Sequence, residues 1–303
     1  MVFMKKWKKV SLYTSIFLAL NFLCKELTDD FSIGHLFQPV PQNSFPQMND
    51  PENLSSMLHQ KYTYLGKGNQ AFVFLSEDGE YVLKLFRPLF PSFYYTLFGK
   101  SHRIRPVKFP FAKTILEKIY AKEFSDQKRK DLQSFVNAFT WVKEETQLEY
   151  LHLEKTNHLK HTLKIYDKIN SLHSLDLDNT CFLIQKKTNL LYPTLASLIQ
   201  RNELDKAKQL ISAFVDLSSG LIAKGVDNPT SIERNLGCMG LQPVQIDVGR
   251  VFMAKDLDAS CKANQLTHSA RHMSKWLTRK APNLVPYLEE TIEKKKEAFI
   301  QGT

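Results

Sequence analysis

The chain has 303 residues, 43% of them hydrophobic, and a formal net charge of +10. This length and composition are typical of a globular protein with a hydrophobic core, built as one two-lobed domain or two small domains. The scattered cysteines form no CxxC pair, which argues against a zinc site or a disulfide framework and favours lone buried thiols. The positive charge favours an anionic partner, such as phosphate groups or a membrane surface.

The N-terminus has a basic flank and then an apolar run from Val10 to Cys24; the flank is Lys5, Lys6, Lys8 and Lys9. A run of about 15 apolar residues fits a signal-peptide core better than a full membrane span of about 20. Because no small-x-small cleavage site follows, we predict an uncleaved signal-anchor over residues 1–27 that holds the chain at a membrane. The alternative is a buried N-terminal helix.

The next segment, residues 28–58, is polar and aperiodic, and it is rich in proline: Pro39, Pro41, Pro46 and Pro51. This pattern is typical of a linker between an anchor and a folded domain. We therefore predict that the globular domain covers residues 59–303.

The domain is predicted to begin with a sheet. Three β-type runs lie around a glycine-containing turn and the Asp78-Gly79 hairpin turn: Tyr62–Leu65, Phe72–Leu75 and Tyr81–Phe86. Apolar residues at helical spacing then predict a helix over Asp131–Gln147. Three more strands are expected after it: Tyr150–Leu153, Leu163–Tyr166 and Cys181–Gln185.

A basic segment, Gly99 to Lys130, precedes this helix, and only Glu117, Glu123 and Asp126 oppose its positive charges. No RNA-binding motif accompanies it, so nucleic acid is a weak option, and we expect contact with an anionic membrane surface. Five aromatic residues lie just before it: Phe90, Phe93, Tyr94, Tyr95 and Phe98. They could enter the membrane interface. Alternatively, they pack into the sheet-rich part while the lysines form a solvated helix face.

The rest of the chain is mainly helical. A strong amphipathic pattern predicts a helix over Leu204–Ala223, with Gly225 in the position of a C-terminal cap. A short buried strand at Val244–Val248 precedes two further helices, at Ser269–Arg279 and Pro286–Gln301. This order predicts an α+β protein with a sheet-rich first part and a helical second part.

Two motifs in the predicted sheet could bind phosphate. The two glycines of Gly66-Lys67-Gly68 let a strand turn approach an anion closely, so that backbone N–H groups can meet it, although such turns are common. Lys84 lies inside an otherwise apolar strand, where an unpaired ammonium is costly. It therefore needs a partner, or it extends to solvent from an edge strand.

A third motif falls in the helical part. Asp247 follows an apolar strand and precedes Gly249, and Asn235 lies in the preceding loop. Carboxylate and amide oxygens suit Mg²⁺, which takes one or two protein oxygens together with phosphate oxygens. The alternative is a plain hairpin, with Asn235 in a turn and Asp247 as a cap.

In this order, the glycine turn, the strand lysine, the loop asparagine and Asp247-Val248-Gly249 resemble the protein-kinase superfamily. The resemblance covers about Tyr62 to Arg250, and the chain looks closest to divergent bacterial kinase-like proteins. It implies a bilobal, kinase-like fold, with a sheet-rich N-lobe over 59–187 and a short helical C-lobe over 188–303. It also implies ATP and Mg²⁺ as ligands.

By this resemblance, the glycine turn would cover the phosphates, and Lys84 would hold them while pairing with a helix glutamate. We choose Glu145, because it lies three residues after Val142 and near the buried face, whereas Glu144 would point further to solvent. Both glutamates could instead form an exposed acidic helix end. The asparagine and aspartate of the third motif would bind Mg²⁺.

The sequence departs from the family at the catalytic base. The family places an aspartate five residues before the metal-binding asparagine, where this chain has Thr230. Either a longer loop brings Asp227 to the acceptor hydroxyl, or the base is missing. Only 53 residues follow Arg250, which argues against an ordinary platform for protein substrates.

We therefore expect a membrane-associated, kinase-like phosphotransferase that acts on a hydroxyl of a protein, a lipid head group or a small molecule. The alternative is a catalytically inactive pseudokinase that serves as a regulatory or scaffold module at a membrane. A third interpretation is a basic membrane-surface protein without a nucleotide role.

Overall fold

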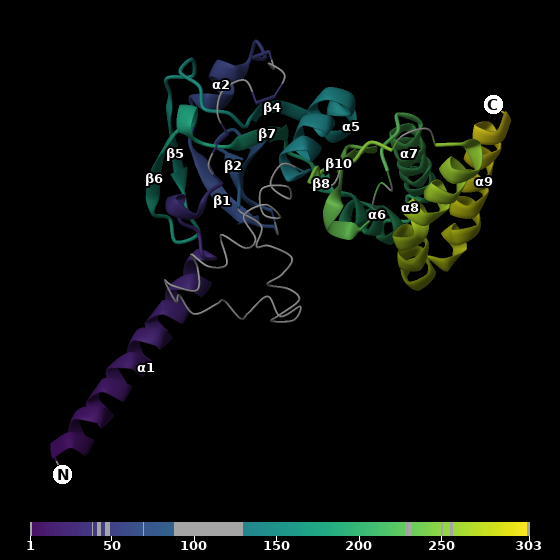
Figure 1. Cartoon of the computed structure of the whole chain (residues 1–303). Helices are drawn as coiled ribbons and strands as arrows, with labels where there is room; N and C mark the ends of the chain where they lie inside the picture. Colours follow the sequence, from purple (N-terminus) through teal and green to yellow (C-terminus); the bar gives the residue numbers. More distant parts are fainter. Residues whose placement is uncertain are drawn as a thin grey trace. The chain divides into compact units, whose positions relative to one another are not determined.

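A computed structural model of the chain is shown in Figure 1. It describes residues 2–37, 39–40, 44–45, 49–68, 70–87, 130–227, 229, 232–249, 251–254 and 257–301. The chain divides into two compact units, residues 1–89 with 152–184 and residues 90–151 with 185–303. The sequence predicts a boundary between two lobes at residue 187, with residues 130–151 in the first lobe. In the structure, residues 130–151 belong to the unit that contains the later helices. The basic segment before Lys130 and its aromatic neighbours lie outside the described residues, so their role stays a prediction.

A curled, seven-stranded sheet has the strand order β4-β7-β3-β2-β1-β5-β6 (Figure 1). Its strands are β1 (Tyr62–Lys67), β2 (Ala71–Ser76), β3 (Tyr81–Phe86), β4 (Leu148–His152), β5 (Thr162–Tyr166), β6 (Leu172–Asp176) and β7 (Phe182–Lys186). β1, β2 and β3 are antiparallel neighbours, whereas β1 and β5 pair in parallel. The six strands predicted here are confirmed within two residues. β6 was missed because only Leu175 among its residues is buried.

The segment predicted to be a linker is partly packed within the first unit. It contains the short helices η1 (Ile33–His35) and α2 (Leu54–Leu58). Its buried apolar side chains are Phe31, Leu36, Phe37, Leu54, Met57 and Leu58. The ring of Phe31 meets those of Phe72 and Phe74 edge to face, with centroids 5.0 and 5.4 Å apart. These apolar residues are too irregularly spaced to give a period, which is why the sequence pattern suggested a free linker.

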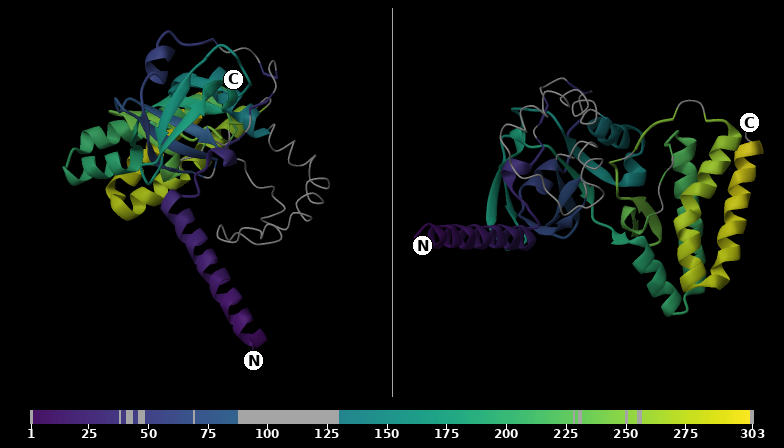
Figure 2. Two further views of the ribbon diagram at one scale, coloured as in Figure 1. Left: turned by 90° about the vertical axis from the view of Figure 1, so that its left-hand side faces the viewer. Right: turned by 60° about the horizontal axis from the view of Figure 1, so that its bottom comes forward.

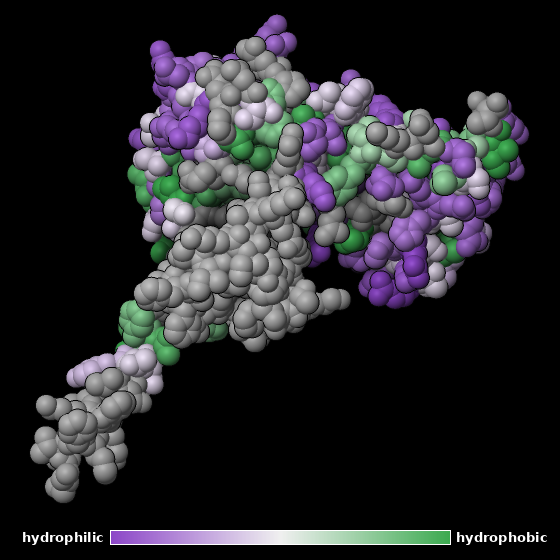
Figure 3. Space-filling view, viewed as in Figure 1, coloured by the Kyte–Doolittle hydropathy of each residue, from purple (hydrophilic) through white to green (hydrophobic). Residues whose placement is uncertain are grey.

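Helix α1 (Val2–Thr28) extends the predicted apolar run in both directions and projects from the sheet of its unit (Figures 1 and 2). Several large apolar side chains are exposed along it: Tyr13, Ile16, Phe17, Leu18, Leu20, Phe22, Leu23 and Leu27. Part of the surface of α1 is green in Figure 3, the colour of hydrophobic residues. These side chains are therefore not buried in the way that the alternative of an N-terminal core helix required. Within the described residues, no helix has a stretch long and apolar enough to cross a membrane.

A cluster around Asp29 holds the end of α1 to the sheet. The Asp29 carboxylate accepts a hydrogen bond from the Tyr64 hydroxyl at 2.8 Å and another from Lys168 Nζ at 3.2 Å. Lys67 Nζ lies 3.3 Å from the same carboxylate. Lys168 also donates to the carbonyl oxygen of Glu26, in the last turn of α1, at 3.2 Å. Burial opposes ionisation here, but the bonds from Tyr64, Lys168 and Lys67 outweigh it and hold the pKa of Asp29 below its usual value.

We expect Asp29→Asn to lower the free energy of unfolding of the first unit by about 1–2 kcal/mol, because charge-assisted hydrogen bonds are replaced by neutral ones. A carboxylate whose pKa is lower in the folded state stabilises the fold above its unfolded pKa of about 3.9, and this contribution is lost as the pH falls through the folded pKa. Urea unfolding should therefore show a difference between wild type and variant at pH 6 that shrinks toward pH 3.

A matched control is Glu77→Gln, because Glu77 is 60% exposed and lies 3.9 Å from its partner Lys61. It should change stability by less than about 0.5 kcal/mol. A difference for Asp29→Asn that does not change with pH would show that the charge of Asp29 does not stabilise this junction.

The second unit is mainly helical. Residues 130–141 form a helix, and α5 (Lys143–Thr146), α6 (Leu191–Gln200), α7 (Leu204–Ala223), α8 (Ala259–Lys280) and α9 (Val285–Gln301) follow. α7, α8 and α9 pack side by side (Figure 2). The buried face of α7 has the predicted period: Ala207, Leu210, Ile211, Phe214, Leu217 and Leu221. The sheet and these helices confirm the predicted α+β class, and α6 is a helix that the sequence analysis missed.

The helix predicted over Asp131–Gln147 is wrong in one respect, because it is interrupted at Val142. The φ and ψ of Val142 are −136° and 36°, outside the helical region. Its side chain is fully buried, so tertiary packing rather than helix propensity decides its conformation. Glu144 and Glu145 therefore belong to the short helix α5 and not to the longer helix before it.

The cysteine prediction is confirmed for two of the four thiols. Cys181 and Cys238 are buried, whereas Cys24 and Cys261 are exposed, and none of the four is in a disulfide. Cys24 lies on the exposed helix α1, and Cys261 lies in the first turn of α8, so neither position required an apolar environment.

Candidate functional site

A β-hairpin in the second unit joins the two predicted magnesium ligands. Its strands are β9 (Leu236–Met239) and β10 (Gln242–Gln245), and β8 (Asn189–Leu190) pairs with β9 on the other side. Leu236 lies opposite Gln245, and the pairing continues one step further because the Ile246 N–H donates to the carbonyl oxygen of Asn235 at 2.9 Å. Asn235 directly precedes β9, and Asp247 follows Ile246. Both residues are therefore at the same open end of the hairpin.

Local hydrogen bonds fix the backbone on either side of this end. Asn235 is buried and closes the short helix η3 (Glu233–Asn235), with its N–H donating to the carbonyl oxygen of Ile232 at 2.8 Å. The Asp247 carboxylate is partly exposed and accepts from the Gly249 N–H at 3.1 Å through Oδ1. Gln245 Nε2 donates to the carbonyl oxygen of Asp247 at 3.1 Å. This arrangement is a cap, as the alternative expected, and among the described residues the cap uses only Oδ1 of the carboxylate.

The chemistry of these two side chains fits a hard cation. Among the described residues, no group of three or more His, Cys, Asp or Glu side chains gathers in the way that a metal held by protein ligands alone would need. Mg²⁺ does not need such a group, because it keeps water and substrate phosphates and takes one or two carboxylates. One amide oxygen and one carboxylate oxygen at a hairpin end are sufficient for that mode of binding.

Asp227 is joined to the segment that follows Asp247. Its N–H donates to the carbonyl oxygen of Phe252 at 2.8 Å, and Val226 forms a bridge with Met253. Gly225, at a φ of +87°, makes the turn that ends α7 and allows this pairing. Asp227 Oδ1 accepts from Gln265 Nε2 of α8 at 3.0 Å. Thr230, at the position of the family's base, lies outside the described residues.

The predicted phosphate-binding residues lie in the first unit. Gly66 lies within β1, paired with Val73 of β2, whereas Gly68 is in the turn after β1, where its N–H donates to the carbonyl oxygen of Ala71 at 2.8 Å. The pairing of β1 with β2 shifts register between Tyr64 and Gly66. Lys84 lies in β3, paired with Val73 of β2, and it is partly exposed. β3 is an inner strand of the sheet, so the alternative of an edge strand for Lys84 is wrong.

The choice between the two glutamates of α5 is supported by their exposure. Glu145 is only 18% exposed, whereas Glu144 is exposed. Glu145 Oε1 pairs with Lys224 Nζ at 2.5 Å, while Oε2 is buried and has no hydrogen-bond partner among the described residues. Lys84 belongs to the first unit and Glu145 to the second, so their pairing stays a prediction.

Several polar residues around Asp227 and Asp247 were missed by the sequence analysis. Ser134 and Asn137, in the helix 130–141, bind backbone atoms just after Asp247, and Gln265 binds the Asp227 carboxylate. Each is a single polar residue within an amphipathic helix, where it does not differ from a solvent-facing position in the sequence. The only signal in the sequence was that Ser134 lies next to Phe135, on the apolar side of its helix.

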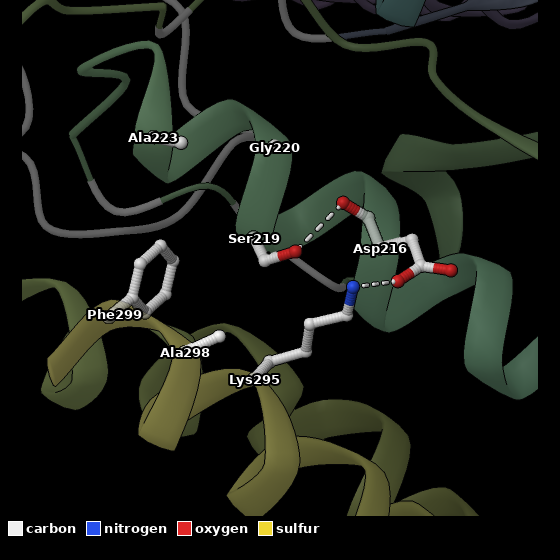
Figure 4. Close-up of a pocket in the computed structure, with 7 residues that line it drawn as sticks. All are labelled: Asp216, Ser219, Gly220, Ala223, Lys295, Ala298 and Phe299. Atoms are coloured by element: carbon white, nitrogen blue, oxygen red, sulfur yellow. Dashed lines mark hydrogen bonds and ion pairs between the residues drawn. The ribbon is translucent and has the colours of Figure 1, made fainter. Parts of the chain in front are cut away.

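A shallow depression between α7 and α9 lies apart from these residues (Figure 4). It is lined by Asp216, Ser219, Gly220, Ala223, Lys295, Ala298 and Phe299. Lys295 Nζ pairs with Asp216 at 2.7 Å, and both side chains are substantially exposed, so the pair adds little to stability. None of the predicted site residues lines it.

Within the second unit, hydrogen-bonded backbone thus connects Asp227, Asn235 and Asp247, whereas the glycine turn and Lys84 are part of the first unit. No protein-family model matches the chain, and no curated protein is significantly similar to it.

Proposed function

We propose that the chain is a kinase-like protein that binds ATP with Mg²⁺ and transfers the terminal phosphoryl group to a hydroxyl. The observation that carries this proposal is the β9–β10 hairpin, which places Asn235 and Asp247 together at its open end. A loop asparagine and an aspartate followed by glycine form a metal-binding pair in the kinase superfamily. The resemblance of the sequence to that superfamily extends the proposal to a bilobal, kinase-like fold.

The residues would divide the chemistry by unit. In the second unit, Asn235 and Asp247 would hold Mg²⁺, which neutralises phosphate charge when bound. In the first unit, Lys84 and the backbone of the Gly66–Gly68 turn would contact the phosphates. Asp227 would accept the proton of the acceptor hydroxyl. The oxygen of that hydroxyl would form a bond to the γ-phosphorus of ATP while the bond from this phosphorus to the leaving ADP breaks.

A pseudokinase is the second candidate, and a specific contact favours it. Gln265 Nε2 donates to Asp227 Oδ1, so this carboxylate is already partly satisfied by a neighbouring helix. Thr230 stands where a base is expected. A chain of this kind would bind ATP and Mg²⁺ without transfer and act as a regulatory or scaffold module.

Attachment to a membrane is also proposed, and the exposed apolar side chains of α1 support it. Lysines at its N-terminal end suit an anionic lipid surface, where each contributes about 1 kcal/mol. The helix is apolar on more than one face, and such a helix is stable when a membrane or a partner covers it. The acceptor hydroxyl would then belong to a protein or a lipid at that surface.

We expect ATP with Mg²⁺ to stabilise the full chain by about 2.7 kcal/mol when ATP is present at about 100 times its dissociation constant. The reason is that a ligand bound only to the folded state shifts the unfolding equilibrium. Thermal unfolding with ATP, with ATP and Mg²⁺, and with Mg²⁺ alone measures this effect. No shift at millimolar ATP with Mg²⁺ would contradict both the enzyme and a nucleotide-binding pseudokinase. If ATP with Mg²⁺ does stabilise the chain, a measurement of product formation separates the enzyme from the pseudokinase.

A further inference from the structure

A buried hydroxyl of the helix 130–141 is hydrogen-bonded to the chain just after Asp247. Ser134 is fully buried, and its Oγ donates to the carbonyl oxygen of Val248 at 2.8 Å. The same oxygen accepts from the Val251 N–H at 2.7 Å. One side chain thus closes a loop of backbone that begins one residue after Asp247.

A second side chain, one turn along the same helix, supports this link. Asn137 Nδ2 donates to the carbonyl oxygen of Val251 at 3.0 Å, and its Oδ1 accepts from Gln133 Nε2 at 3.0 Å. The helix therefore binds both backbone groups of Val251, the N–H through Ser134 and the carbonyl through Asn137. Buried backbone groups are costly to leave unpaired, so this pair of contacts fixes the position of the segment.

The fixed segment leads directly to both aspartates. On its N-terminal side, Val248 is followed by Gly249, whose N–H donates to the Asp247 carboxylate. On its C-terminal side, Phe252 accepts from the Asp227 N–H and Met253 bridges to Val226. A shift of the helix would therefore move the carboxylate of Asp247 and the backbone of Asp227 together.

We infer that Ser134 and Asn137 are positioning residues for Asp247, which hold its carboxylate in the orientation that binds Mg²⁺. The role in metal binding rests on the proposed function. The mechanical part does not, because it concerns only the coupling of the helix to the turn at Asp247. Groups that orient a metal ligand change metal affinity by about 10–100-fold when they are removed, although they do not contact the metal.

The test uses the full chain and the variants Ser134→Ala and Asn137→Asp. Ser134→Ala removes the hydroxyl from both partners. Asn137→Asp replaces a donor to the Val251 carbonyl by an acceptor at a partly exposed position, so it carries less risk of unfolding. We expect amide hydrogen exchange at Val251 and Gly249 to become at least about tenfold faster in both variants. ATP affinity in the presence of Mg²⁺ should fall about tenfold, while ATP affinity without Mg²⁺ stays unchanged.

Ser219→Ala is the matched control, because Ser219 is a buried helix serine whose hydroxyl donates within its own helix, to Asp216 at 3.0 Å. It should change neither exchange at Gly249 nor the effect of Mg²⁺. Faster exchange at Val251 alone, with Gly249 unchanged, would overturn the inference, since the link would not reach Asp247. An equal loss of affinity with and without Mg²⁺ would also overturn it. If the wild type binds no ATP, the proposed function fails, and exchange at Gly249 still decides whether the coupling exists.

Discussion

We expect Asp247→Asn to remove the Mg²⁺-dependent part of ATP binding, a loss of at least about 100-fold, or about 2.7 kcal/mol. The substitution keeps the size of the side chain and leaves Oδ1 able to accept from the Gly249 N–H. It removes the negative charge, and a neutral amide oxygen is a much weaker ligand for a hard divalent cation than a carboxylate. Isothermal titration of ATP at fixed concentrations of Mg²⁺ measures the change.

Asp258→Asn is a suitable control for this experiment. Asp258 also ends a loop with its carboxylate capping a backbone N–H, that of Cys261 at 2.6 Å at the start of α8. Its substitution removes the same charge from the same unit and should leave the effect of Mg²⁺ intact. If Asp247→Asn behaves like Asp258→Asn, Asp247 is a cap only and the metal assignment is wrong.

Six strands of the sheet and the positions of the C-terminal helices could be predicted because their apolar residues repeat with a regular period. The strands β6, β8 and β9 were not predicted, and α8 begins at Ala259, ten residues before the predicted helix at Ser269. The helix predicted over Leu204–Ala223 has the bounds of α7, since ten of its residues are buried at helical spacing. The strand before Asp247 could also be anticipated from its apolar residues, although β10 covers Gln242–Gln245 rather than the predicted Val244–Val248. In these elements, local pattern and tertiary packing agree.

Other features depend on contacts between residues that are distant in the sequence. The break at Val142 comes from packing of a buried side chain, and the pairing of Glu145 with Lys224 joins residues that are far apart in the chain. The bonds of Ser134 to Val248 and Val251 likewise link positions more than a hundred residues apart. A single sequence has no periodic signal for such contacts.

Gly237 is a further residue whose role only the structure reveals, and we expect Gly237→Ala to cost about 1–3 kcal/mol of stability by overpacking. A Cβ at Gly237 would lie 2.1 Å from Thr188 Oγ1, 2.8 Å from Thr188 Cβ and 3.0 Å from Ile246 Cγ2. Gly237 pairs with Val244 in β10 and with Leu190 in β8, so the strands cannot separate freely to admit a methyl group. Chemical unfolding measures the loss.

The same substitution should also reduce the effect of Mg²⁺ on ATP binding, because Ile246, which the new methyl group would press upon, lies between β10 and Asp247. Gly220→Ala is the control: Gly220 lies in α7, and a methyl group added there would meet nothing within 4 Å, so this change should stabilise the chain by about 0.5–1 kcal/mol.

Adding Thr188→Ala to Gly237→Ala removes the nearest atom, Oγ1, and should restore part of both losses. If the double variant recovers stability but not the effect of Mg²⁺, the strain at Ile246 rather than the contact with Thr188 displaces Asp247. If Gly237→Ala changes neither the stability nor the effect of Mg²⁺ on ATP binding, the hairpin can adjust to the added methyl group. Its register is then not what holds Asn235 and Asp247 together.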